Sequence, residues 1–260
     1  MEQHLADHLA FLKERVFQTG TKWPQFELLL GDIADLARET PADATVVGLE
    51  RTLLYGGISL VAPFFARATY ISVDCSPESA DTRGAYNDWM TDDARCIRRP
   101  YDRRGQPAAT GLEAASADLV LVPNLVHHVR DQHGFFAEMA RILKPGGRLY
   151  VFEPLVRELH QKPDDFVRYT PSGVETMCAE AGMTVERVRD QGGPFEVISY
   201  CWTQALEYIP EEERKSWTEW FYGKHMPELL EMDRKYPDNL VRKHTSFPMT
   251  WSVLASKAAA

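Results

Sequence analysis

ADLVLVPNLVHHVRDQHGFFAEMARILKPGGRLYVFEP, residues 117–154, decides the fold of this chain. The stretch reads as a buried strand, a turn with two adjacent histidines, an amphipathic helix, a Gly-Gly stop and a second buried strand. Two parallel strands joined by a helix form a βαβ unit. Open sheets of this kind bind ligands at the carboxyl ends of their strands. Those ends carry Asn124, His127, His128 and Glu153, so the stretch predicts a site with titratable groups.

Strand-like and helix-like segments alternate on both sides of this unit. Strands are expected at residues 45–49, 69–73, 94–97, 119–123, 148–152, 184–189 and 250–256. Helices are expected at residues 57–66, 76–89, 134–143 and 171–181, with a helical but broken segment at 199–235. Such alternation predicts an α/β protein with a doubly wound, mostly parallel sheet.

Two amphipathic segments precede the α/β pattern. Apolar residues recur three or four positions apart over residues 3–17 and 24–38, which predicts two helices. We therefore expect a helical N-terminal cap over residues 1–43, covering the mouth of the site. The domain itself is expected over residues 44–260, with a C-terminal helical insertion around residues 199–240.

The composition limits the cellular environment and the binding partners that we expect for this chain. The formal net charge of −9 over 260 residues argues against a nucleic-acid partner, which normally selects a basic surface. The four cysteines show no CxxC spacing, so a reduced, cytoplasmic setting is expected. We expect no signal peptide and no membrane insertion, because no apolar run reaches about 20 residues. The apolar and aromatic C-terminal half is compatible with a homodimer.

With these residues in place, the chain resembles class I S-adenosylmethionine-dependent methyltransferases of the methyltransferase type 11 kind. The resemblance covers residues 44–188 and the final strand, and it is most specific between Asp118 and Pro154. The later run FVRYTP, residues 166–171, is similar to the stretch before the family's sixth helix. The paired histidines and the acid after the fifth strand resemble the members that methylate hydroxyls of sugars and small molecules. The resemblance implies a Rossmann-like methyltransferase fold.

The resemblance also implies a cofactor site for S-adenosylmethionine. Asp74 ends the second strand, where the family places the acid that binds the ribose hydroxyls; capping of a following helix is the alternative. Glu50 stands where the family has the acid that pairs with the cofactor's ammonium group. The turn after it departs from the pattern, since Arg51 and Leu53 occupy positions where the family prefers small residues. The full set of expected cofactor contacts is Glu50, Tyr55, Gly56, Gly57, Asp74, Cys75, Asp102 and Asn124.

Methyl transfer to an oxygen requires an oriented acceptor and a group that removes the hydroxyl proton. Histidine suits that task, and a carboxylate can orient it. His127, His128 and Glu153 are therefore the expected catalytic residues, with either histidine open as the base. Two adjacent histidines cannot point the same way from extended backbone, so one is expected to brace the turn. Arg168 and Tyr169 are expected to line the pocket of a small-molecule or glycan acceptor.

Three alternatives compete with this interpretation. The chain could be a catalytically degenerate relative that serves as a binding or partner protein, because its glycine turn has decayed. A metal site of His127, His128, Glu153 and His160 lacks the usual ligand spacing, so no metal is expected. A nicotinamide-dependent oxidoreductase would carry G-x-G-x-x-G after the first strand, and that motif does not occur there.

Overall fold

The central sheet has seven strands in the described part of the chain, in the order β5-β4-β1-β6-β7-β9-β8. The computed structural model describes residues 2–20, 23–50, 54–55, 58–75, 96–100, 110–160, 162–163, 165–243 and 245–259. The sheet strands are β1 (Thr45–Glu50), β4 (Thr69–Asp74), β5 (Cys96–Pro100), β6 (Ala117–Pro123), β7 (Leu143–Pro154), β8 (Met183–Gln191) and β9 (Thr250–Lys257). The first five in the spatial order run parallel, and β9 is antiparallel to both of its neighbours. The predicted doubly wound, mostly parallel α/β sheet is confirmed.

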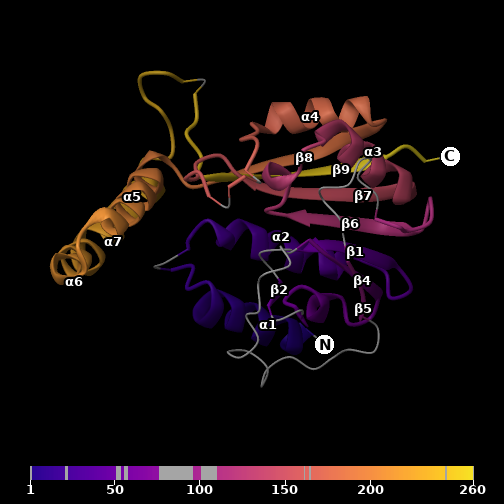
Figure 1. Cartoon of the computed structure of the whole chain (residues 1–260), viewed down its shortest axis with the longest axis horizontal. Helices are drawn as coiled ribbons and strands as arrows, with labels where there is room; N and C mark the ends of the chain where they lie inside the picture. The colour runs from indigo at the N-terminus through magenta and orange to yellow at the C-terminus, as the bar shows by residue number, and fades with distance from the viewer. Residues whose placement is uncertain are drawn as a thin grey trace.

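Helices cover both faces of this sheet, in two separate apolar clusters (Figure 1). Side chains of a strand alternate between faces, and β6 illustrates this. Val120 and Val122 pack with α3 (Gln132–Ile142) and α4 (Pro171–Glu180). Leu119 and Leu121 pack on the opposite face with α2 (Phe26–Glu39). The near-continuous apolar run of β6 is thus what a strand buried on both faces requires.

Asp32 ties α2 to the sheet. Its fully buried carboxylate accepts hydrogen bonds from the Tyr150 hydroxyl at 3.1 Å, the Ser252 hydroxyl at 2.6 Å and Nη1 of Arg189 at 2.5 Å. Both predicted N-terminal helices exist, as α1 (Glu2–Phe11) with a following π-helical turn and as α2. Because α2 packs against the sheet as a core layer, residues 1–43 form part of the hydrophobic core and are not only a cap over the site. A domain boundary at residue 43 stays a prediction.

The predicted helix at residues 57–66 is wrong for the residues described. Instead, β2 (Leu54–Tyr55) pairs with β3 (Ile58–Ser59), and a 3-10 turn follows at Ala62–Phe65. The Ser59 hydroxyl accepts hydrogen bonds from the backbone N–H groups of Val61 and Ala62 at 3.1 and 2.9 Å. Pro63 has no N–H to donate, so the segment forms only this short turn.

Two other boundaries differ from the prediction. The strand expected at residues 94–97 is β5, which begins at Cys96 and ends at Pro100. The expected stop at residues 144–147 lies inside β7, where the pairing with β6 shifts register between Ala117 and Leu119. Gly146 there has φ +77°, a conformation that side chains disfavour. The helix expected at residues 76–89 lies outside the described residues.

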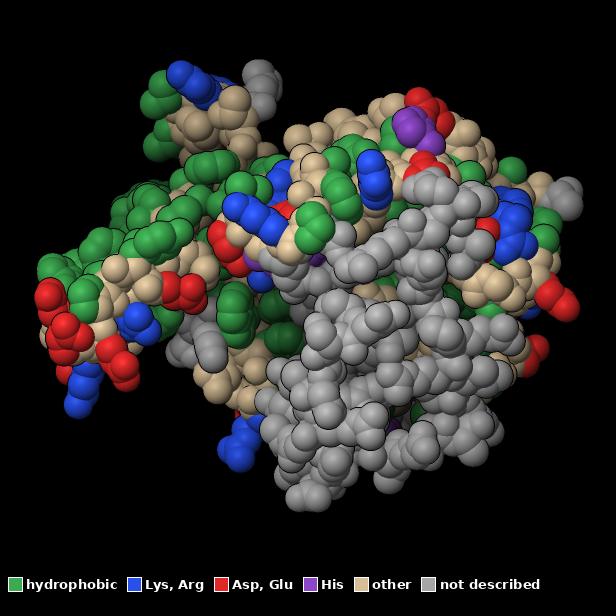
Figure 2. All heavy atoms as spheres, viewed as in Figure 1, with side chains coloured by type: hydrophobic (Ala, Val, Ile, Leu, Met, Phe, Trp, Pro, Cys, Tyr) green, Lys and Arg blue, Asp and Glu red, His purple; other side chains and the backbone are tan. Residues whose placement is uncertain are grey.

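The broken helical segment is confirmed as an arm of three helices that extends away from the sheet (Figure 1). These are α5 (Pro194–Ala205), α6 (Glu211–Trp220) and α7 (Met226–Lys235). Figure 2 shows apolar side chains gathered on this arm. The exposed large apolar residues of these helices include Ile198, Trp217 and Trp220. No helix among the described residues has the length and apolar character needed to cross a membrane.

Candidate functional site

The carboxyl ends of four parallel strands bring most of the predicted site residues to one edge of the sheet. Glu50 at the end of β1 is the register partner of Asp74 at the end of β4. Asn124 follows β6, and its backbone N–H donates to the carbonyl of Phe152 on β7 at 2.7 Å. Glu153 is the next residue of β7. The predicted site residues at the ends of these four strands therefore lie along the same edge of the sheet.

His127 and Glu153 form a buried pair at this edge. Nδ1 of His127 lies 2.5 Å from Oε2 of Glu153, and both residues are no more than 2% exposed. Oε1 of Glu153 accepts the backbone N–H of Val126 at 2.6 Å, which fixes the carboxylate. A carboxylate only accepts, so the ring proton belongs on Nδ1 and the lone pair on Nε2. Nε2 is buried and has no hydrogen-bond partner among the described residues.

The two adjacent histidines lie on a 3-10 turn, Val126–His128, and not on extended backbone. The expectation that their side chains diverge is therefore wrong: their ring centroids are 4.0 Å apart. Asn124 makes the reversal between β6 and this turn with φ +57°, a conformation that asparagine tolerates better than most residues. His128 is buried beside His127 and remains in the candidate site.

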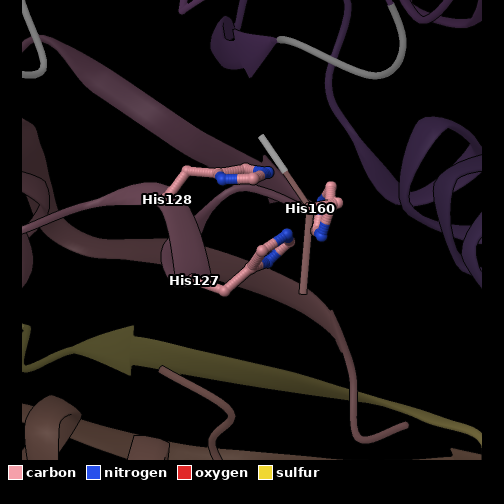
Figure 3. Close-up of side chains that lie close together, drawn as sticks. All are labelled: His127, His128 and His160. Atoms are coloured by element: carbon pink, nitrogen blue, oxygen red, sulfur yellow. The ribbon is translucent and has the colours of Figure 1, made fainter. Parts of the chain in front are cut away.

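His160 joins this pair, although it was not among the expected catalytic residues. Its ring centroid lies 5.4 Å from that of His127 and 4.9 Å from that of His128 (Figure 3). Its Nδ1 is 3.1 Å from the carbonyl oxygen of Glu158. Burial and the positive charge of Arg157 lower the pKa of His160, so the neutral imidazole is favoured at pH 7. The three rings thus face one another at the edge of the sheet.

Arg168 organises the segment that carries His160. Its guanidinium makes a two-armed pair with the Asp165 carboxylate at 2.5 and 2.9 Å and donates to the Glu158 carbonyl at 2.9 Å. Asp165 in turn accepts the backbone N–H of His160 at 2.9 Å. Burial opposes the ionisation of Asp165, but the Arg168 and His160 hydrogen bonds prevail and hold its pKa well below the usual range. Arg168 thus holds the segment that carries His160 in place, and its role in the acceptor pocket stays a prediction.

Tyr169 lies farther along the same segment and contacts the core. Its ring packs against the apolar cluster under α3 and α4, and a Cβ placed on Gly173 would meet that ring at 2.7 Å. Its carbonyl accepts the indole N–H of Trp251 at 2.9 Å. Burial raises the pKa of the Tyr169 hydroxyl. A place for Tyr169 in the acceptor pocket stays a prediction.

Glu50 is the centre of a buried hydroxyl network. Its carboxylate accepts from the hydroxyl of Tyr70 at 2.8 Å and from those of Ser59 and Ser72. A Cβ on Gly48 would lie 1.9 Å from the Tyr70 hydroxyl oxygen, so only glycine lets that hydroxyl reach Glu50. These contacts are structural, and the predicted role toward an ammonium group stays a prediction.

The other predicted cofactor contacts are placed only in part. The backbones of Tyr55 and Asp74 lie in β2 and at the end of β4, but their side chains are not described. Cys75 is buried, and its backbone N–H donates to the carbonyl of Glu50 at 2.8 Å. Gly56, Gly57 and Asp102 lie outside the described residues. Their roles stay predictions.

A cavity of about 1140 Å³ lies between the helical arm, α2 and the end of β8, which all contribute residues to its lining. Acidic side chains outnumber basic ones among its lining residues, and they include Glu27, Asp190, Glu196 and Asp233. Asp233 on α7 accepts the backbone N–H groups of Phe195 and Glu196 and so caps the start of α5. Burial, reinforced by the charge of Asp233, raises the pKa of Glu196 to about 7.

Replacing Glu196 with glutamine is expected to stabilise the protein at pH 8 but not at pH 5. The raised pKa means that folding favours the protonated acid, so the free energy of unfolding falls as the pH rises from its ordinary pKa of 4.5 to about 7. We expect a gain of about 1–2 kcal/mol at pH 8. Urea denaturation at both pH values measures it, and an equal effect at both would contradict the assignment.

Comparisons with known proteins agree with this architecture. Residues 56–151 match the family model of a methyltransferase domain. A candidate sarcosine dimethylglycine methyltransferase from Galdieria sulphuraria superposes with a TM-score of 0.53 at 15% identity, over 88% of this chain and 84% of that one. A candidate methyltransferase from Bacillus halodurans gives 0.54 at 16% identity, over 88% and 100%. The 4+2 cyclase SpnF gives 0.52 at 16% identity, over 90% and 83%. No curated protein matches the sequence significantly.

Proposed function

We propose that this chain is an S-adenosylmethionine-dependent O-methyltransferase, on the basis of its doubly wound sheet and of the match of residues 56–151 to the family model of a methyltransferase domain. The acceptor class is a hydroxyl on a sugar, glycan or other small metabolite. The single observation that carries the proposal is the buried His127–Glu153 pair with its unpartnered Nε2. The solved structures of similar fold include a candidate sarcosine dimethylglycine methyltransferase and a cyclase, so the fold alone does not name the acceptor.

S-adenosylmethionine, when bound, supplies an electrophilic methyl group on a sulfonium sulfur. The residues at the sheet edge fit such a cofactor, because the acidic residue Asp74 ends β4 directly beside the end of β1. We assign Asp74 to the ribose hydroxyls and the backbone around Cys75 and Asn124 to the wall of the site. Glu50 fits less well, because three hydroxyls already hydrogen-bond to its carboxylate.

His127 is the proposed base. Its Nε2 accepts the proton of the acceptor hydroxyl, while Nδ1 keeps its hydrogen bond to Glu153. Glu153 holds the ring in the required tautomer and stabilises the imidazolium that results. An alcohol needs such a base because its own pKa is high, whereas a neutral amine already has a free lone pair. The pair therefore favours oxygen over nitrogen as the acceptor atom.

A methyl-transfer assay over a panel of sugar and small-metabolite hydroxyls tests this function. The full chain is incubated with S-adenosylmethionine, and S-adenosylhomocysteine is quantified together with the mass of the methylated product. Hydroxyl acceptors are expected to gain one methyl group, and matched amines are expected to react poorly. Exclusive amine methylation would overturn the O-methyl assignment and leave the methyltransferase activity in place.

One observation favours a second candidate, a degenerate relative that binds ligands or partners without catalysis. The hydroxyl network around Glu50 makes this carboxylate part of the core rather than a ready contact for a charged ligand. Calorimetry with S-adenosylhomocysteine separates the two candidates. Binding is expected from the enzyme, and a folded protein without any heat of binding favours the second candidate.

Asp74→Ala is expected to weaken binding of S-adenosylhomocysteine by about 30-fold or more, as loss of a charged hydrogen-bond acceptor implies. The residue is at the carboxyl end of β4, next to Glu50 in the register. Calorimetry measures the affinity, and circular dichroism confirms the fold. Glu113→Ala removes an exposed carboxylate elsewhere and is the matched control. Unchanged affinity in the Asp74 variant would remove this residue from the cofactor site.

Two further expectations belong to the proposal. The free thiols of Cys75, Cys178 and Cys201 support a reducing, cytoplasmic location. The exposed apolar side chains of the α5–α7 arm support a homodimer that covers them. Sedimentation at several protein concentrations measures the assembly state.

A further inference from the structure

We propose that His127, His128 and His160 together bind one Zn²⁺ ion. One ligand nitrogen of each ring lies within 4.8 Å of the other two. Figure 3 shows the three side chains converging on a shared space from two parts of the chain, the turn after β6 and the segment after β7. This site is independent of any cofactor, and it contradicts the expectation from spacing that no metal binds here.

The hydrogen bonds of His127 prepare it as a ligand. The Glu153 carboxylate at Nδ1 leaves the buried Nε2 as a lone pair without a partner among the described residues. A carboxylate behind a coordinating histidine is the arrangement that fixes the tautomer and raises the basicity of zinc ligands. Glu153 is itself held by the backbone N–H of Val126, so the ring has a defined direction.

His160 is prepared in the same way. Its Nδ1 lies 3.1 Å from the Glu158 carbonyl oxygen and 3.3 Å from Oδ2 of Asp165. A ring that donates from Nδ1 presents Nε2 as its ligand atom. Asp165 also holds the backbone of His160 at 2.9 Å and is clamped by Arg168. Two of the three histidines therefore have a carboxylate behind them.

The geometry suits zinc after a small contraction. Zn–N bonds of about 2.0–2.1 Å in a tetrahedron separate the nitrogens by about 3.3 Å. The ligand nitrogens, which all lie within 4.8 Å of one another, must therefore approach by up to about 1.5 Å. Three histidines leave a fourth position open, as in zinc sites that bind water or substrate. Imidazole nitrogen is a ligand that binds zinc in preference to magnesium or calcium, which prefer oxygen ligands.

Calorimetric titration of the metal-free full chain with ZnCl₂ tests the site without any methyl donor. The Cys201→Ser background removes an exposed free thiol, because cysteine thiolates are themselves zinc ligands. We expect one ion per chain, and X-ray absorption is expected to find nitrogen ligands at about 2.0 Å. His160→Gln and, separately, His128→Gln are expected to weaken binding at least 100-fold. His133→Gln, which removes an exposed histidine on α3, is the matched control and is expected to bind normally.

Three outcomes overturn the proposal. The first is a folded protein that takes up no zinc. The second is equal affinity in the His160 and His133 variants, which would mark the ion as adventitious. The third is normal binding in the His128→Gln variant. Thermal unfolding of each variant without metal confirms that a loss of binding is not a loss of fold.

The metal site and the proposed base share Nε2 of His127, so the two functions exclude one another. Methyl transfer is therefore expected to persist in EDTA and to fall at least tenfold with one equivalent of Zn²⁺. The failures of the two proposals are distinguishable. If the metal-free protein binds zinc but shows no methyl transfer when assayed in EDTA, the methyltransferase proposal fails and the zinc site stands. If it transfers methyl groups but binds no zinc, the zinc site fails and the methyltransferase proposal stands.

Discussion

His127→Ala is expected to lower methyl-transfer turnover by about 10²–10⁴-fold, the range for loss of a general base. Affinity for S-adenosylhomocysteine should stay within about twofold, because the histidine acts on the acceptor rather than on the cofactor. The physical reason is the buried Nε2 held in direction by Glu153. Steady-state kinetics and calorimetry on the same preparations measure both quantities.

Two companion variants sharpen this experiment. Glu153→Gln keeps the shape of the partner but removes the charge that stabilises the imidazolium, so turnover should fall by about 10-fold or more. His133→Ala removes a solvent-exposed histidine on α3 and should leave turnover unchanged. If His127→Ala retains full turnover, His127 is not the base, and His128→Ala then tests its neighbour.

Glu50→Ala is expected to lower the free energy of unfolding by about 3 kcal/mol, because buried hydroxyls lose their acceptor. Those hydroxyls belong to Ser59, Tyr70 and Ser72, and each is on a residue that is no more than 4% exposed. Urea denaturation measures the loss. Glu113→Ala, at an exposed position, should change stability by less than about 0.5 kcal/mol.

Glu50→Gln separates the structural role from the one that the resemblance implies. The amide keeps one acceptor oxygen, so a smaller loss of stability is expected than for alanine. If the glutamine variant is as stable as the wild type but loses affinity for S-adenosylhomocysteine, the carboxylate serves the cofactor and the structural assignment is wrong.

The parallel centre of the sheet was predictable because β1, β4 and β6 are short, largely apolar strands. Residues 117–154 gave a strand, a helix and a strand, and the structure has β6, α3 and β7 there. Residues 57–66 misled because their apolar length suggested a helix, whereas Ser59 and Pro63 favour a hairpin and a short turn. Local hydrogen bonds decided this segment, and hydrophobic periodicity does not report them.

The candidate site was predictable where strand ends define it and not where a loop returns to it. His127, His128 and Glu153 follow directly from the ends of β6 and β7. His160 could not be predicted in this way. The Phe166 N–H donates to the His127 carbonyl at 2.9 Å and so brings the segment of His160 back to the histidine turn, and no sequence pattern indicates this long-range hydrogen bond. The Asp165 and Arg168 pair, three residues apart, was the available hint that this segment is ordered.

The position of β9 has a consequence for biosynthesis. This strand lies between β7 and β8, although it is the last of the described strands in the chain. While the ribosome is still making residues 250–257, β7 has an unpaired edge and β8 has no neighbour in the sheet. Unpaired edges invite association with other chains. The nascent polypeptide therefore depends on residues 250–257 to complete the sheet, and products terminated before these residues are expected to aggregate.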